Sequence, residues 1–220
     1  MELQGLYDAI LNGDAQTAGA LTHEALEAGV QPVDIITQAM VPSMAEVGRR
    51  FECEEYYVPE LLLSARAMKA AIEPLRPLLA ASGARSAGKV VIGTVQGDLH
   101  DIGKNLVASM LEGGGFEVID LGADVPPEKF AAEAGASGAH IVALSALLTT
   151  TMPGMNATIT ALGLAGLRDK VKVMIGGAPV TQQFADQIGA DGYAENASAA
   201  VAVARTLILS RCAPTDLMRP

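Results

Sequence analysis

The stretch that decides the fold reads Val90-Val91-Ile92-Gly93-Thr94-Val95-Gln96-Gly97-Asp98-Leu99-His100-Asp101-Ile102-Gly103-Lys104-Asn105. Its β-branched apolar start is typical of a buried strand, and residues 106–111 follow with the apolar spacing of a helix. Asp98 and His100 are therefore predicted to lie on the loop between a strand and a helix. In an open parallel sheet, ligands bind at the carboxyl ends of the strands. The sequence thus predicts a ligand site at this loop.

The residue types in the loop favour a metal ligand. A carboxylate two residues before an imidazole can accept a hydrogen bond from one ring nitrogen and leave the other for a metal ion. Gly97 and Gly103 allow sharp turns of the backbone and the approach of a bulky group. An isolated loop histidine is more often bonded to the backbone, but His100 has Asp98 as a partner and lies between two glycines.

Strand-like and helix-like segments alternate from residue 89 onward. We predict strands at 89–95, 116–121, 140–145, 171–175 and 191–193, and helices at 103–113, 126–136, 153–167, 180–188 and 196–210. Such alternation gives a parallel sheet with helices on both faces. Five strands favour an α/β fold with the flavodoxin-like, doubly wound strand order.

Residues 1–84 show helical patterns only, which predicts a four-helix bundle. Asp14 is expected to cap the second helix, and Pro32 to occupy the first turn of the third. Pro42 is expected to kink that third helix or to leave a carbonyl unpaired. The fourth helix begins near Tyr57, and its predicted inward side comprises Leu61, Leu62, Ala65, Met68, Ile72 and Leu75.

The chain is predicted to consist of two domains. Residues 82–88 contain no large apolar side chain, and we place a linker at 85–88. This boundary divides the chain into a helical domain at 1–84 and a Rossmann-like sheet domain at 89–220.

Composition excludes several classes of protein. Of 220 residues, 50% are hydrophobic and 18% are charged, which supplies a packed core. A formal charge of −10 and an aromatic content of 4% argue against nucleic-acid binding. The sequence lacks a signal-peptide pattern and an apolar run of membrane-spanning length. We interpret Cys53 and Cys212 as reduced thiols of a cytoplasmic protein.

Two other sites common on such folds do not match. A response-regulator receiver needs its phosphoacceptor carboxylate after the third strand and a lysine after the fifth, where this chain has Ser145 and Glu195. A dinucleotide site needs a glycine spacing that Gly93-x-x-x-Gly97 does not provide.

Three elements in order, Asp98-x-His100-x-x-Gly103, Ser145-x-Leu147 and Gly176-Gly177, carry a resemblance to a known family. They resemble the corrinoid-binding pattern of the cobalamin domain of methionine synthase. The chain is still more similar to the stand-alone corrinoid proteins of methanol, methylamine and methoxy-aromatic methyltransferase systems. Because the helical segment also resembles the cap of those proteins, the likeness covers nearly the whole chain.

The resemblance implies a role for each site residue. His100 is implied to be the lower axial ligand of cobalt, Asp98 its hydrogen-bond partner, and Thr151 a hydroxyl that extends this relay. Ser145 and Thr149 are implied to bond the nucleotide tail of the cofactor, although a Ser/Thr run also suits a helix start. The other implied cofactor contacts are Gly97, Leu99, Asp101, Ile102, Gly103, Leu147, Gly176, Gly177, Tyr193 and Ala197, with Tyr57 and Leu61 from the cap.

The resemblance also implies a function without a catalytic side chain in this chain. We expect a corrinoid-binding methyl carrier that holds cobalamin, as methylcobalamin or another corrinoid, and serves as a subunit of a methyltransferase system. Its expected partners are a substrate-specific methyltransferase, a second, acceptor-side methyltransferase and a reductive activase, with no nucleic acid and no membrane.

Two alternatives remain open. Adenosylcobalamin-dependent isomerase subunits share the Asp-x-His-x-x-Gly loop, but they resemble residues 89–220 alone. Cobalamin-dependent sensors have a similar cap, but this chain shows no helix-turn-helix pattern, and its acidity disfavours DNA contact.

Overall fold

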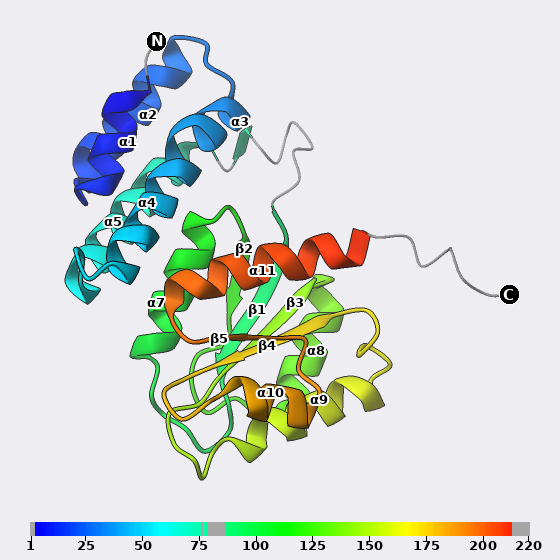
Figure 1. The fold of residues 1–220 in the computed structure, drawn as a ribbon. Coiled ribbons are helices and arrows are strands. Elements are labelled where there is room, and N and C mark those ends of the chain that lie inside the picture. Colours follow the sequence, from blue (N-terminus) through cyan, green and yellow to red (C-terminus); the bar gives the residue numbers. More distant parts are fainter. Residues whose placement is uncertain (1–2, 76, 79–86, 213–220) are drawn as a thin grey trace, which may run out of the picture. The chain divides into compact units, whose positions relative to one another are not determined.

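The structure is a computed structural model of the chain, and it describes residues 3–75, 77–78 and 87–212 (Figure 1). The chain divides into two compact units. The helical unit comprises Met1–Ser86 and Asn105–Glu117, and the sheet unit comprises Ala87–Lys104 and Val118–Pro220. The predicted domains, 1–84 and 89–220, assign the segment 105–117 to the sheet instead. The predicted linker begins at residues 85–86, which lie outside the described residues.

The helical unit contains the helices expected from the sequence. They are α1 (Gln4–Leu11), α2 (Ala15–Glu27), α3 (Pro32–Ile35), η1 (Ile36–Met40), α4 (Val41–Glu52), α5 (Val58–Ile72) and the 3-10 turn η2 (Glu73–Leu75). Asp14 caps α2 as predicted, because its Oδ1 accepts a hydrogen bond of 3.0 Å from the Thr17 N–H. Pro32 is the first residue of α3, also as predicted.

The third predicted helix contains a π-helical segment close to Pro42. Ile36–Met40, directly before the proline region, form a π-helical segment between α3 and α4. Proline has no N–H and its ring crowds the preceding turn. A wider π-helical turn accommodates such a site, so the α-helical pattern is interrupted next to Pro42, while the kink or the unpaired carbonyl stays a prediction.

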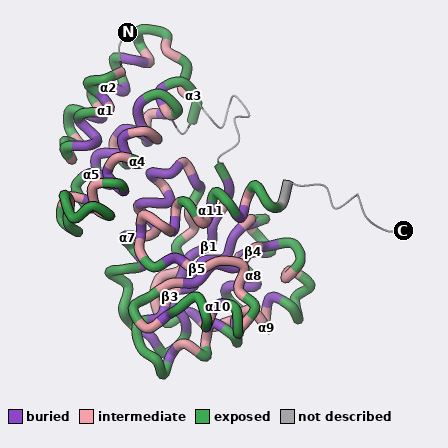
Figure 2. Tube along the Cα trace, viewed as in Figure 1, coloured by how far each residue is buried: buried purple, intermediate pink, exposed green. Residues whose placement is uncertain are grey.

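The core of the helical unit lies between α1, α2, α4 and α5 (Figure 2). Leu61, Ala65, Met68 and Ile72 form the buried side of α5. Leu62 is exposed, so its predicted inward position is wrong. Consecutive residues of a helix point about 100° apart, and the stripe that includes Leu61 leaves Leu62 on the solvent side.

The sheet unit has the predicted doubly wound fold. Its strands are β1 (Lys89–Thr94), β2 (Glu117–Asp120), β3 (Ile141–Ser145), β4 (Lys172–Gly176) and β5 (Gly192–Ala194), in the order β2-β1-β3-β4-β5. The strands run parallel, and Thr94, Ser145, Gly176 and Ala194 are aligned across four of them. The loops that follow these strands therefore leave the sheet along one edge.

Helices cover both faces of this sheet (Figure 1). The helices that follow the strands are α7 (Ile102–Gly113), α8 (Pro127–Ser137), α9 (Pro153–Leu164), α10 (Gln182–Ile188) and α11 (Ala197–Cys212), and α7 belongs to the helical unit from Asn105 on. One core cluster joins alternate strand residues, such as Val142 and Leu144, to α8, α9 and α10. On the opposite face, α11 packs against β3, β4 and β5.

Candidate functional site

Asp98 joins two loops at the carboxyl edge of the sheet. Its side chain is fully buried. Oδ1 accepts a hydrogen bond of 3.0 Å from the His100 N–H. Oδ2 accepts bonds of 2.7 Å from the Leu147 N–H and the Thr151 hydroxyl, and lies 3.4 Å from the Leu148 nitrogen. The loop after β1 and the loop after β3 are thus fixed to one carboxylate.

These bonds also set the charge of Asp98. Burial by itself raises the pKa of a carboxyl group, because it disfavours the charged form. The donors from Leu147, Thr151 and His100 outweigh that effect and hold the pKa of Asp98 well below its ordinary value. Asp98 is therefore an ionised carboxylate, which can only accept hydrogen bonds.

The Asp98 carboxylate fixes the tautomer of His100. Nδ1 of the imidazole lies 2.7 Å from Asp98 Oδ1. Because the carboxylate has no proton to donate, Nδ1 carries the hydrogen, and Nε2 is the ring nitrogen that can present a lone pair to a metal ion. The His100 side chain is 52% exposed, whereas that of Asp98 is 0% exposed. The arrangement is that of a half-exposed imidazole held at one ring nitrogen by a buried anion, as in many metal-binding histidines.

Large apolar side chains are exposed on the same two loops. Leu99 and Ile102, on either side of His100, are 77% and 79% exposed, and Leu147 and Leu148 are each 43% exposed. One exposed leucine on a protein surface is ordinary, but four on two joined loops are typical of a binding surface. Such a surface suits a ligand that combines a broad apolar face with an atom that takes a nitrogen ligand.

Gly176 and Gly177, two of the implied cofactor contacts, also have a structural reason to be glycine. A Cβ atom at Gly177, whose φ is +133°, would lie 1.9 Å from the Ala146 carbonyl oxygen, and one at Gly176 would lie 2.9 Å from the Ala194 oxygen. Neighbouring backbone fills the space beside both glycines, so they permit the loops to approach each other closely.

The remaining predicted residues of the sheet unit lie at or near the same edge. Ser145 ends β3 and is half-buried, while Thr149 is exposed on the loop that follows. Tyr193 lies in β5 and packs against the sheet core, and Ala197 is buried at the start of α11. The structure brings Asp98, His100, Leu147 and Thr151 into direct contact with one another, and the cofactor contacts of all the predicted residues stay predictions.

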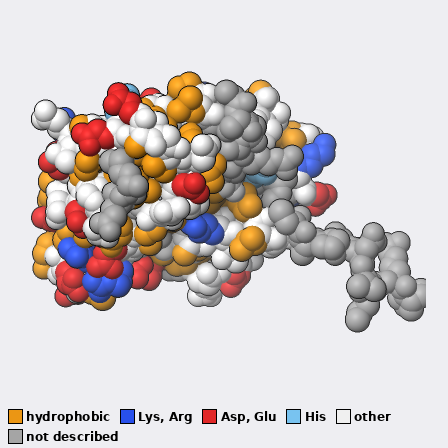
Figure 3. Space-filling view, turned by 90° about the horizontal axis from the view of Figure 1, so that it is seen from above, with side chains coloured by type: hydrophobic (Ala, Val, Ile, Leu, Met, Phe, Trp, Pro, Cys, Tyr) orange, Lys and Arg blue, Asp and Glu red, His pale blue; other side chains and the backbone are white. Residues whose placement is uncertain are grey.

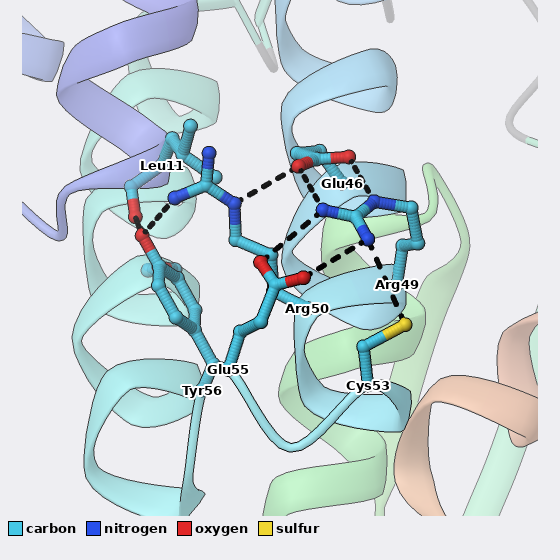
Figure 4. Close-up of polar contacts among 8 residues, drawn as sticks. Leu11, Glu46, Arg49, Arg50, Cys53, Glu55 and Tyr56 are labelled. Atoms are coloured by element: carbon cyan, nitrogen blue, oxygen red, sulfur yellow. Dashed lines mark hydrogen bonds and ion pairs between the residues drawn. The ribbon is translucent and has the colours of Figure 1, made fainter.

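Tyr57 and Leu61 belong to the helical unit and differ in exposure. Tyr57, which caps α5, is 62% exposed, whereas Leu61 is fully buried. The turn before Tyr57 is held by Arg50, which bonds both Glu46 and the Tyr56 hydroxyl (Figure 4). The predicted cofactor contact thus depends on Tyr57 more than on Leu61.

Sequence reasoning missed two residues that bond the His100 loop, Thr94 and Asp124. Both lie at or just beyond the carboxyl end of a strand, the place where polar side chains reach a ligand site in a parallel sheet. Asp124 follows Gly122 by two residues, a pattern that signals a turn. This turn pattern after a strand is the signal from which Asp124 could have been predicted.

A doubly wound sheet that presents one imidazole at its carboxyl edge, together with a separate helical unit, defines a cofactor-binding protein of two parts. Comparison with known proteins identifies the cofactor: residues 88–202 and residues 2–76 each match a B12 binding domain family. The chain belongs to the family of B12-binding corrinoid proteins, as the resemblance in the sequence indicated.

Relatives match almost the full length of the chain. It is 46% identical to the dimethylamine corrinoid protein of Methanosarcina barkeri, over 94% of this chain and 97% of that protein. It is 45% identical to trimethylamine corrinoid protein 1 of Methanosarcina acetivorans, over 92% and 94%.

Two solved structures are also similar. A cobalamin-binding protein from Desulfitobacterium hafniense DCB-2 has a TM-score of 0.78 and 34% identity, with 94% of this chain and 98% of that chain covered. The methanol:cobalamin methyltransferase complex MtaBC from Methanosarcina barkeri gives 0.81 and 33%, with 94% and 79% covered.

The residues at the edge fit a corrinoid. A corrin ring offers a broad, largely apolar face and a cobalt ion that accepts nitrogen, which matches the partly exposed His100 imidazole among Leu99, Ile102 and Leu147. Within residues 3–75, 77–78 and 87–212, no cluster of three or more His, Cys, Asp and Glu side chains is suited to hold a metal ion by itself. The predicted cofactor class, a corrinoid, is therefore confirmed by the family and by the chemistry of this edge.

Two further features of the described residues concern surface charge and membrane-spanning helices. On the face drawn in Figure 3, acidic and basic side chains lie next to each other, without a broad basic region. No helix in the described part of the chain has the length and apolarity needed to cross a membrane.

Proposed function

We propose that this protein is a methyl carrier that binds a corrinoid with His100 Nε2 as the lower axial ligand. The observation that carries the proposal is the Asp98–His100 pair. A buried, ionised carboxylate holds Nδ1 at 2.7 Å, which leaves the second ring nitrogen for a ligand, and the imidazole side chain is half exposed. This orientation is the one a metal-binding histidine needs, since the nitrogen opposite its hydrogen-bond partner carries the lone pair.

When bound, the corrinoid supplies a cobalt ion that accepts a methyl group and releases it again. The chain's own residues bind, orient and protect. Asp98 fixes the imidazole, and Thr151 and the Leu147 N–H hold Asp98 in place. Leu99 and Ile102 offer apolar surface to the ring, and we infer that Tyr57 of the helical unit shields its upper face.

We infer two partners for one carrier. A substrate-specific methyltransferase delivers the methyl group, and a second methyltransferase removes it. The similarity to a chain of the MtaBC complex and to methylamine corrinoid proteins supports the first partner. The second methyltransferase, the reductive activase and the cytoplasmic location stay predictions from the sequence.

The full-length similarity favours the methyl carrier over the alternatives. Isomerase subunits resemble the sheet domain alone, whereas the relatives named above align with 92–94% of this chain, including the helical unit. The net charge of −10 weighs against a DNA-binding regulator. The chain itself is then a corrinoid subunit, and its partners supply the catalytic groups.

Electron paramagnetic resonance of the cobalt(II) form tests the ligand directly. The purified chain is produced with natural or nitrogen-15 histidine and loaded with hydroxocobalamin, which is then reduced to cobalt(II). We expect the axial nitrogen coupling to change from a triplet to a doublet on labelling, because only a protein imidazole carries the label.

Two variants complete the test. His100→Ala is expected to lose this label-dependent coupling, and His23→Gln, a change at an exposed histidine of α2, is expected to keep it. A wild-type signal that is unaffected by labelled histidine would overturn the assignment. Transfer of a methyl group from methylamines or methanol, in the presence of a matching methyltransferase, then separates a carrier from a sensor.

A further inference from the structure

The loop after β2 runs alongside the end of β1 and continues the pairing of the two strands. The Leu121 N–H donates to the Ile92 oxygen at 2.8 Å, and Thr94 bonds Gly122 and Val125 through its N–H and its carbonyl, both at 3.0 Å. Val95 and Val125 form a parallel bridge. The loop is therefore positioned next to the turn that carries Asp98 and His100.

Asp124 contacts that turn at two points. Its Oδ1 accepts a hydrogen bond of 2.7 Å from the Gly97 N–H, and its own N–H donates to the Asp98 carbonyl oxygen at 3.0 Å. The φ angle of Asp124 is +54°, a left-handed conformation that is uncommon for a residue with a side chain. Such conformations persist where surrounding bonds hold them, and they concentrate at functional sites.

Thr94 supplies a third point of contact. Its side chain is fully buried, and its hydroxyl donates a hydrogen bond of 2.9 Å to the His100 carbonyl oxygen. The main chain is thus held at Gly97, at Asp98 and at His100 by groups outside the turn. None of these three contacts uses the Asp98 carboxylate.

We propose that Asp124 and Thr94 are positioning residues of the corrinoid site, which fix the main chain of residues 97–100 so that the His100 imidazole meets the cobalt. The proposal rests on the proposed function of His100. The Asp98 carboxylate orients the ring and ties the turn to the loop after β3, whereas Asp124 and Thr94 hold the main chain of the turn to the loop after β2 and to the end of β1. A metal ligand must be held within about 0.5 Å of its productive position, which contacts from several sides of the turn support.

A series at Asp124 separates the hydrogen bond from the backbone conformation. Asp124→Gly removes the acceptor but adopts a positive φ freely, while Asp124→Asn keeps both an Oδ1 acceptor and tolerance of that φ. We expect the glycine variant to bind hydroxocobalamin about three- to tenfold more weakly, the range for one lost hydrogen bond. We expect the asparagine variant to bind like the wild type.

The decisive measurement is the share of cobalt(II) that shows coupling to labelled histidine at saturating hydroxocobalamin. At saturation, weaker binding no longer affects the signal, so a reduced share reports a displaced imidazole. We expect this share to fall in Asp124→Gly and to stay at the wild-type level in Asp124→Asn. A merely structural role would lower stability without changing the ligation of bound corrinoid.

Thr94 provides an independent series. Thr94→Val removes the hydroxyl at nearly constant shape, and Thr94→Ser keeps it. We expect the valine variant to lose part of the histidine-coupled share and the serine variant to retain it. Circular dichroism identifies folded variants, and because Asp124 is exposed, Asp124→Gly decides the question even where the buried valine prevents folding.

The outcomes distinguish this proposal from the one on which it rests. A wild type without histidine coupling removes the ligand assignment and the positioning roles together. A wild type with full coupling, combined with full coupling in Asp124→Gly and in every folded Thr94 variant, overturns the positioning roles alone.

Discussion

One oxygen of Asp98 bonds His100 twice. Oδ1 accepts the His100 N–H at 3.0 Å and lies 2.7 Å from the ring Nδ1 of the same residue. The two contacts close a small ring in which the main chain and the side chain of the histidine are fixed by one atom. Because Asp98 is buried and ionised, its position also depends on the hydrogen-bond donors to its second oxygen. The first two predictions concern these bonds.

Asp98→Asn is expected to destabilise the corrinoid-free protein by about 2–3 kcal/mol. An amide has one oxygen, so whichever way it turns, its NH₂ faces either His100 or the donors on the Leu147 loop. Urea denaturation followed by circular dichroism measures the loss. Asp101→Asn, an exposed neighbour on the same loop, serves as the control and should change stability by less than about 0.5 kcal/mol. Equal stability of Asp98→Asn and wild type would contradict the role of the carboxylate.

Thr151→Val is expected to cost about 1–2 kcal/mol, because Asp98 Oδ2 then loses its hydroxyl donor while the shape is kept. The Thr151 oxygen also lies 2.9 Å from the Leu148 carbonyl oxygen, but the carboxylate is the stronger acceptor. Thr151→Ser retains the hydroxyl and should lose much less. The urea midpoints of the two variants test this expectation. A serine variant as unstable as the valine variant would show that the stability depends on the Thr151 methyl group instead of its hydroxyl.

Gly177→Ala is expected to destabilise the protein by about 3 kcal/mol or more, since the new Cβ would lie 1.9 Å from the Ala146 oxygen at a φ of +133°. Gly163→Ala is the matched control, because a Cβ at this position in α9 meets nothing within 4 Å. That substitution should leave stability unchanged or raise it by up to about 1 kcal/mol. Thermal unfolding measures both, and a harmless Gly177→Ala would mean that the two loops separate easily.

The strands could be predicted from the sequence because continuous apolar runs such as Val90–Ile92 indicate buried parallel strands, and their order because five strands alternating with helices favour the doubly wound arrangement. The predicted β1, 89–95, and the observed Lys89–Thr94 differ by one residue. The prediction that Leu62 faces inward was wrong because apolar periodicity locates the buried side of a helix but not its width. Exposed apolar residues are common on protein surfaces.

The candidate site was only partly predictable. Asp98 and His100 are two residues apart, so their contact follows from local geometry. The bond from Thr151 to Asp98 spans 53 positions, and its prediction came from the family resemblance and not from spacing. Asp124 could not be assigned, because its contact with Gly97 depends on how two loops pair beyond the ends of their strands.

Glu46 holds two arginines at the end of α4. Its carboxylate accepts two bonds of 2.8 Å from Arg49 and one of 2.9 Å from Arg50, and Arg49 also bonds Glu55 at 3.3 Å (Figure 4). These bonds, mainly those from Arg49, lower the pKa of Glu46 from 4.5 to about 2. Since Arg50 also bonds Tyr56, the cluster ties α4 to the turn that precedes Tyr57.

The pKa shift of Glu46 predicts how stability depends on pH. A carboxyl group whose pKa is lower in the folded state stabilises that state fully above its unfolded value of 4.5, and less as the pH falls toward about 2. We therefore expect Glu46→Gln to lower the urea midpoint by a constant amount between about pH 7 and pH 5.5, and by a shrinking amount below 4.5. Glu24→Gln on α2 serves as the control. A difference between Glu46→Gln and wild type that persists unchanged near pH 3 would mean that the ion pairs contribute nothing, because packing alone is insensitive to protonation at about this pH.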